Sequence, residues 1–156
     1  MSPRAACRLA TLGFSRVYDY TPGKVDWLAR GLPGEGLRAN DPTAGSLARR
    51  DVATSPLDAS TGDVRRAIAD SPYGYALVLS PGGVVLGRVR KSALDALSDG
   101  DPIDTVLEPR PQTIRPHLTE AKLQERFEAY GFRTLVVTRS DGTLIGVVQR
   151  DDIATV

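Results

Sequence analysis

The feature that most constrains the fold of this chain is an internal repeat. The segment from Asp51 to Leu97 superposes without a gap on the segment from Arg110 to Val156, at a constant offset of 59 residues. The positions that agree are turn glycines and apolar residues, which set secondary structure, whereas most surface positions differ. The matched pairs include Val64/Leu123, Ile68/Phe127, Tyr73/Phe132, Gly83/Gly142, Gly87/Gly146 and Leu94/Ile153. Two copies of one supersecondary unit are therefore predicted.

The second copy predicts a strand, a helix, a hairpin and a short closing helix. Residues 112–114 are an extended entry, and a helix follows between the N-cap Thr119 and the terminating Gly131. The runs 134–138 and 144–148 are apolar strands around an Asp-Gly turn. A last helix opens at residues 151–153. The unit therefore has the order β-α-β-β-α.

The first copy repeats that order, with a helix over 64–69, strands over 76–79 and 84–89, and a closing helix over 92–97. The fold class is α/β (α+β). Because the hairpin strands are apolar on both faces and one unit has too little core alone, we expect the two copies to pack on each other.

Composition excludes several classes of function. With one cysteine, Cys7, and one histidine, His117, there is no disulfide framework and no zinc site built from His and Cys. Twenty basic residues against nineteen acidic ones give a net charge of +1, so no long-range field recruits nucleic acid or an anionic membrane. No apolar run is long enough to span a bilayer, and the N-terminus has no apolar signal region. A soluble, cytoplasmic protein is expected.

The first 36 residues form a separate helix-strand-helix extension, with helices over 5–13 and 24–30 and a brief strand over 17–20. Residues 37–47 are a linker rich in turn residues. The extension contains Trp27 and other aromatic side chains, but it is too short to close a sheet that would bury them. We therefore expect it to dock on the repeats or on a second chain.

Candidate catalytic residues are few. Cys7 falls inside the first helix with only arginines as nearby cations, so a buried or half-buried structural thiol is favoured over a nucleophile. His117 lies in a loop without the local partners of a catalytic triad. Gly82-Gly83 is a turn and no phosphate-binding loop. A non-enzymatic protein is predicted.

The repeat resembles the tandem cystathionine-β-synthase (CBS) domain pair. The resemblance rests on residues 86–94, 132–137 and 145–153, where Gly-x-Val ends a hairpin strand and, in the second copy, an acidic residue opens the last helix. It implies a regulatory or ligand-binding module whose units, residues 48–100 and 104–156, pack about a pseudo-twofold axis. It also implies a homodimer and clefts that take AMP, ADP, ATP or S-adenosylmethionine as ligand, with no required cofactor.

The resemblance places a nucleotide site in the second repeat. In the family motif a hydroxyl residue follows the strand and an aspartate comes three positions later; here Gln149 replaces the hydroxyl residue and Asp152 is retained. Asp152 would accept hydrogen bonds from ribose, Arg133 would face phosphate and Phe132 would cover adenine. Thr113 and Ile114, on the entry strand, complete the expected ligand-binding set.

Structural alternatives remain for each of these residues. In the structural interpretation, Asp152 only caps its helix, Arg133 forms an ion pair with Asp151 or Asp152, and Phe132 is a core residue. In the first repeat Ala93 replaces the aspartate, so one nucleotide site per chain is expected. The basic run at residues 88–91 is interpreted as a solvated edge rather than a phosphate site.

The N-terminal extension resembles the C-terminal tail of a rhodanese-like domain, through Gly23-Lys24-Val25-Asp26-Trp27 followed by Gly31-Leu32-Pro33. In rhodaneses the nucleophilic cysteine sits in a loop before the helix, whereas Cys7 falls within it. The preferred function is therefore a CBS-type sensor of an adenosine-containing nucleotide. A ligand-free dimerisation scaffold is the alternative, followed by a sulfurtransferase fragment.

Overall fold

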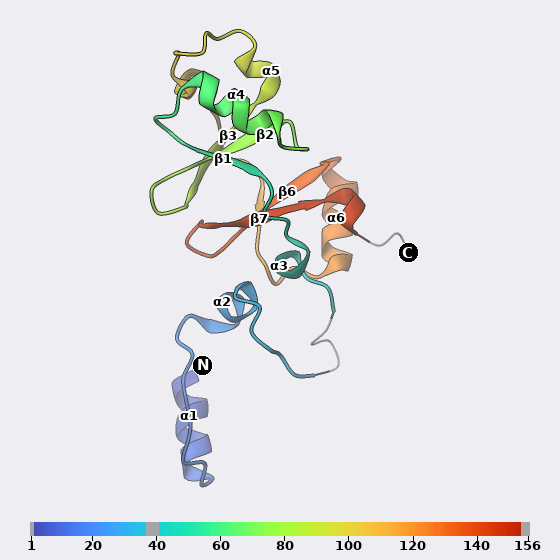
Figure 1. The fold of residues 1–156 in the computed structure, drawn as a ribbon. Helices are drawn as coiled ribbons and strands as arrows, with labels where there is room; N and C mark the ends of the chain where they lie inside the picture. Colours follow the sequence, from blue (N-terminus) through green and yellow to red (C-terminus); the bar gives the residue numbers. More distant parts are fainter. Residues whose placement is uncertain (1, 37–40, 154–156) are drawn as a thin grey trace.

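The computed structural model describes residues 2–36 and 41–153, which form two stacked α/β units and an N-terminal extension (Figure 1). The first unit is a four-stranded sheet of order β1-β2-β3-β4, and the second is a three-stranded sheet of order β5-β6-β7. In both, the entry strand is parallel to the first hairpin strand and the hairpin is antiparallel. The strands are β1 (Ala53–Pro56), β2 (Tyr75–Leu79), β3 (Val85–Arg90), β4 (Glu108–Pro109), β5 (Thr113–Ile114), β6 (Thr134–Thr138) and β7 (Leu144–Gln149).

The main helix of each unit follows its entry strand, as the sequence predicts. Helix α4 (Thr61–Ala69) begins after Ser60, whose side chain accepts a hydrogen bond from the amide of Asp63. Helix α6 (Glu120–Tyr130) ends at Gly131, which has a φ of 64°. The closing elements are shorter than expected: α5 (Lys91–Leu94) and a 3-10 turn, η2 (Arg150–Asp152). Residues 154–156 lie outside the described part of the chain.

The last residues of the stretch 37–47, which the sequence analysis interprets as a linker, are helical, whereas residues 37–40 lie outside the described part of the chain. Residues 44–47 form helix α3 (Ala44–Leu47), which packs on the second unit, where Ala44 is fully buried in the core. At the equivalent position, η1 (Ile103–Val106) packs on the first unit, where Ile103 is fully buried. Each unit is thus completed by the segment that precedes the other one, a contact that local sequence patterns do not reveal.

A third cluster of buried side chains joins the two units. It contains Val52, Tyr75, Leu77, Val136 and Val147, so β2 and β6 face each other across the junction. The hydroxyl of Tyr75 donates a hydrogen bond to Oγ1 of Thr134, 59 residues away, at 3.1 Å. The expected packing of the two repeats on each other is confirmed.

The N-terminal extension differs from its prediction at residues 17–20 and at Cys7. Helices α1 (Ser2–Thr11) and α2 (Gly23–Ala29) form, but residues 17–20 are not a strand, because no strand of the described chain lies beside them. Helix α1 projects away from the repeats (Figure 1), and Phe14 and Tyr18, which follow it, are 59% and 84% exposed. Docking of the extension on a second chain stays a prediction. Cys7 is exposed on α1 rather than buried.

Trp27 is instead packed within the extension. Its ring makes an edge contact with the ring of Tyr20, with the two ring centroids 5.1 Å apart. Its indole nitrogen donates a hydrogen bond to the carbonyl of Pro33. None of the helices in residues 2–36 or 41–153 combines the length and the apolar character that crossing a membrane requires.

Candidate ligand-binding site

A groove of about 700 Å³ opens where β2 and β6 begin. Its lining includes pairs of residues at equivalent positions of the two repeats, such as Tyr73 with Phe132 and Tyr75 with Thr134. A surface lined by equivalent residues of two related units lies on the pseudo-twofold axis that relates them, so we call it the axial groove. It is lined by Pro72, Tyr73, Tyr75, Arg88, Arg90, Gly131, Phe132, Arg133, Thr134, Gln149, Arg150 and Asp151.

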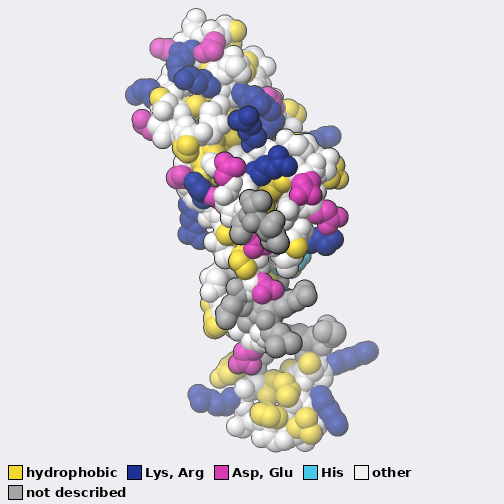
Figure 2. Space-filling model, turned by 90° about the vertical axis from the view of Figure 1, so that its right-hand side faces the viewer, with side chains coloured by type: hydrophobic (Ala, Val, Ile, Leu, Met, Phe, Trp, Pro, Cys, Tyr) yellow, Lys and Arg dark blue, Asp and Glu magenta, His cyan; other side chains and the backbone are white. Residues whose placement is uncertain are grey.

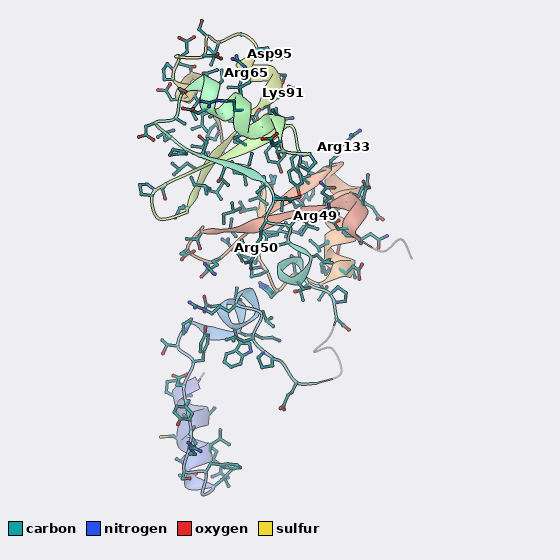
Figure 3. The ribbon with its side chains drawn as sticks, viewed as in Figure 1. Arg49, Arg50, Arg65, Lys91, Asp95 and Arg133 are labelled. Carbon is teal, nitrogen blue, oxygen red and sulfur yellow. The ribbon has the colours of Figure 1, made fainter. Side chains whose placement is uncertain are left out.

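Four arginines make this groove basic. Arg88 and Arg90 donate hydrogen bonds of 2.6 and 2.7 Å to the two oxygens of Glu108. Desolvation tends to raise the pKa of Glu108, but the hydrogen bonds from both guanidinium groups outweigh it and lower that pKa. Arg133, which projects outward in Figure 3, and Arg150 form no ion pair with any other residue in the ranges 2–36 and 41–153. Two guanidinium groups are therefore available to an anion.

Aromatic side chains form the other part of the lining. The rings of Tyr73 and Tyr75 lie 6.0 Å apart, and Phe132 stacks on Tyr130 at 5.7 Å. Burial, and a 2.5 Å hydrogen bond to Asp51, raise the pKa of Tyr73 to about 12. Burial also raises the pKa of Tyr75. Both hydroxyls are therefore neutral at physiological pH and do not repel an anionic ligand.

A smaller cavity of about 110 Å³ adjoins the axial groove. The two share Tyr75, Arg88, Phe132 and Thr134, and the smaller one also reaches Glu108, Pro109, Arg110, Pro111, Gln112 and Val136. We call it the side cavity. It places a carboxylate next to an aromatic wall, an arrangement that suits a base or sugar with hydrogen-bond donors.

Three of the six residues expected to bind ligand line the axial groove: Phe132, Arg133 and Gln149. Phe132 also packs against the core of the second repeat, so the structural alternative for this residue holds as well. The ligand-binding role of all three remains a prediction.

Asp152 is engaged elsewhere. Its carboxylate forms an ion pair with Arg49 and accepts a hydrogen bond from the Gln149 amide at 3.0 Å, as a capping residue does. It does not line the axial groove. Arg49 lies on the segment before β1, where the two repeats meet (Figure 3). The alternative role of Arg133, an ion pair with Asp151 or Asp152, is not seen in the described chain, where Asp152 pairs with Arg49.

Thr113 and Ile114 do not line the groove either. Ile114 is buried in the core of the second repeat, and Thr113 is exposed on β5. The sequence analysis also missed Tyr73, Tyr75 and Arg150, and it treated Arg88 and Arg90 as a solvated edge. The signal that identifies them is the 59-residue offset, because it pairs Tyr73 with Phe132 and brings both to the axis.

In the described ranges, no three His, Cys, Asp or Glu side chains are grouped as a metal ion would require.

The second repeat is similar to one protein family. Residues 103–156 match the model of the CBS domain. No curated protein matches the chain.

Solved structures match over most of the chain. The CBS domains of a transcriptional regulator from Streptococcus pneumoniae are 24% identical with a TM-score of 0.61, over 69% of this chain and 92% of that one. The protein CBSX2 in complex with AMP is 20% identical with a TM-score of 0.62, over 72% of this chain and 92% of that one, and CBSX2 from Arabidopsis thaliana is a CBS-pair protein. The soluble part of a magnesium transporter is 19% identical with a TM-score of 0.66, over 73% of this chain.

The chain spans about half of that magnesium-transporter structure, 46% of its length. At these identities the likeness concerns the fold. Residues 103–156 are therefore similar in sequence to the CBS domain, and the two repeats have the fold seen in CBS-pair structures.

Proposed function

We propose that this protein is a non-enzymatic regulatory module that binds an adenosine-containing nucleotide in the axial groove and the side cavity, one nucleotide per chain. The observation that carries the proposal is the convergence of aromatic and cationic side chains from both repeats on one groove. Aromatic faces bind a purine, and guanidinium groups bind phosphate.

The lining suggests how a nucleotide is arranged. Phe132 and Tyr75, shared by both cavities, offer aromatic contacts to adenine, and Glu108 offers an acceptor for hydroxyl or amino hydrogens. Arg133 and Arg150 then face the phosphates. Two solved structures of similar fold contain such ligands: CBSX2 with AMP, and the cytosolic domain of the magnesium channel MgtE with ATP.

Calorimetric titration with AMP, ADP, ATP and S-adenosylmethionine tests the proposal. We expect saturable binding to the native chain and at least about a tenfold weaker affinity for Phe132→Ala, because a stacked aromatic contact is lost. Tyr18→Ala is the matched control, since Tyr18 is 84% exposed on the N-terminal extension. Absence of heat and of any thermal shift with all four compounds at millimolar concentration would overturn the proposal.

A dimerisation module that needs no ligand is the second candidate. Large apolar side chains on the repeats remain exposed, among them Tyr130 at 65% and Leu57 at 44%. This candidate predicts a dimer in sedimentation velocity whose affinity is the same with and without nucleotide. A monomer at micromolar concentration would exclude it.

A further inference from the structure

The distribution of charge around the axial groove points to a more specific ligand than an adenosine compound in general. Arg88 and Arg90 come from β3 of the first repeat, and Arg133 and Arg150 come from the second. Figure 2 shows Lys and Arg side chains, interspersed with Asp and Glu, on the part of the molecule that the two repeats form. One exposed carboxylate in the lining, Asp151, opposes the four guanidinium groups.

We propose that the axial groove is a single site for a chain of two or more linked phosphate groups, with one such chain bound on the pseudo-twofold axis of each protein molecule. The inference rests on the proposed ligand-binding role of this groove, but it does not require adenosine. Both repeats supply cations to the same ligand, so the site is incomplete in either repeat alone.

The partners of the four arginines explain why a single phosphate group does not use all the cations of the groove. Arg88 and Arg90 already bind Glu108, so a ligand must share them with that carboxylate or displace it. Arg133 and Arg150, whose side chains are free of ion pairs in the described chain, need give up no carboxylate to bind an anion. We expect a single phosphate group to bind at these two arginines. A second and third linked phosphate would extend the contact to Arg88 and Arg90, which line the same groove.

The neutral donors of the groove do not replace the cations. The Tyr73 hydroxyl donates to Asp51 and the Tyr75 hydroxyl to Thr134. Recognition therefore depends on charge, and it weakens as salt screens the partly exposed guanidinium groups. The groove's volume of about 700 Å³ is ample for a triphosphate.

Titration calorimetry with sodium tripolyphosphate, pyrophosphate, orthophosphate, AMP and ATP tests this inference on the full chain. We expect one tripolyphosphate per chain, with orthophosphate at least about tenfold weaker, because charge-assisted contacts add along the ligand. Arg133→Gln and Arg150→Gln should each weaken tripolyphosphate and ATP by about five- to tenfold and AMP by less. Arg126→Gln, an exposed arginine of α6 outside the groove, is the matched control and should change nothing.

The outcomes separate this inference from the proposed function. AMP binding without tripolyphosphate binding, or ATP no tighter than AMP, would overturn the polyphosphate site and leave the nucleotide proposal intact. Tripolyphosphate binding as tight as ATP, with no response to AMP, would support the site and overturn the adenosine proposal. Unchanged tripolyphosphate affinity in both variants would also overturn the site. Arg150 also donates a hydrogen bond to the carbonyl of Phe127, so Arg150→Gln could destabilise the fold. In that case the affinity of the Arg133→Gln variant decides the test.

Discussion

Tyr75 donates a hydrogen bond of 3.1 Å to Thr134, the residue that occupies its own position in the second repeat. The bond therefore joins the two repeats on their axis, at the floor of the axial groove. Tyr75 is 7% exposed, so its hydroxyl has little access to water as an alternative partner.

Tyr75→Phe should lower the free energy of unfolding by about 1 kcal/mol, because Thr134 loses its partner at a partly buried position. Thr134→Val should cost a similar amount, and the double variant should cost less than the sum of the two. Urea denaturation of the four proteins measures this. Strictly additive losses would show that the hydrogen bond does not join the repeats.

Two equivalent glycines are required where each sheet meets the segment that precedes the other repeat. A Cβ at Gly146 would fall on the carbonyl oxygen of Arg49, and a Cβ at Gly87 would lie 2.8 Å from that of Glu108. Because these contacts are with backbone, Gly146→Ala should destabilise the protein by about 2 kcal/mol or more. Gly100→Ala is the control, since its Cβ meets nothing within 4 Å. Equal melting temperatures for the two variants would contradict the close approach.

The second repeat should not fold alone. Its core includes the fully buried Ala44, together with Leu47 and Ala48, which precede the first repeat. A fragment of residues 110–156 should therefore show no cooperative thermal transition, whereas residues 41–156 should show one. Calorimetry of both fragments checks this. A cooperative transition in the shorter fragment would show that the second repeat does not need the segment that precedes the first repeat.

Alkaline pH should destabilise the protein through Tyr73. Its pKa is raised from an ordinary 10.0 to about 12 by burial first and then by Asp51, so the folded state favours the protonated phenol. The stability from this group is fully present below pH 10 and is lost as the pH rises through 12. Tyr73→Phe should reduce the decline of the urea midpoint over this range, and Tyr18→Phe should not. A decline as steep in Tyr73→Phe as in the native protein would exclude the effect.

Asp152→Ala should affect stability more than nucleotide affinity. The variant loses the ion pair with Arg49 and the cap on Gln149, which together contribute about 1 kcal/mol at this partly exposed site. Asp151→Ala removes the same charge from a residue that does line the groove, so it should leave the melting temperature unchanged and strengthen anion binding. Loss of nucleotide binding in a folded Asp152→Ala protein would instead support the ribose-binding role that the motif implies.

The sequence by itself determined the local structure of both repeats. The helix of residues 61–69, the stop at Gly131 and the two hairpins follow from caps, turn glycines and apolar spacing, which act within a few residues. The 59-residue offset also determined that the unit occurs twice. The strand expected over 17–20 failed because a strand forms only where another strand pairs with it.

Only the tertiary structure decided where these elements meet. Arg49 and Asp152 are 103 residues apart, and their ion pair exists because α3 packs on β7 of the other repeat. The axial groove likewise depends on packing that brings Tyr73 and Arg88 of one repeat into the same lining as Phe132 and Arg133 of the other, a contact between repeats. Neither contact has a local signature, because each results from burying the apolar faces of two units against each other. The free energy of that burial, rather than any short motif, selected the residues of the candidate site.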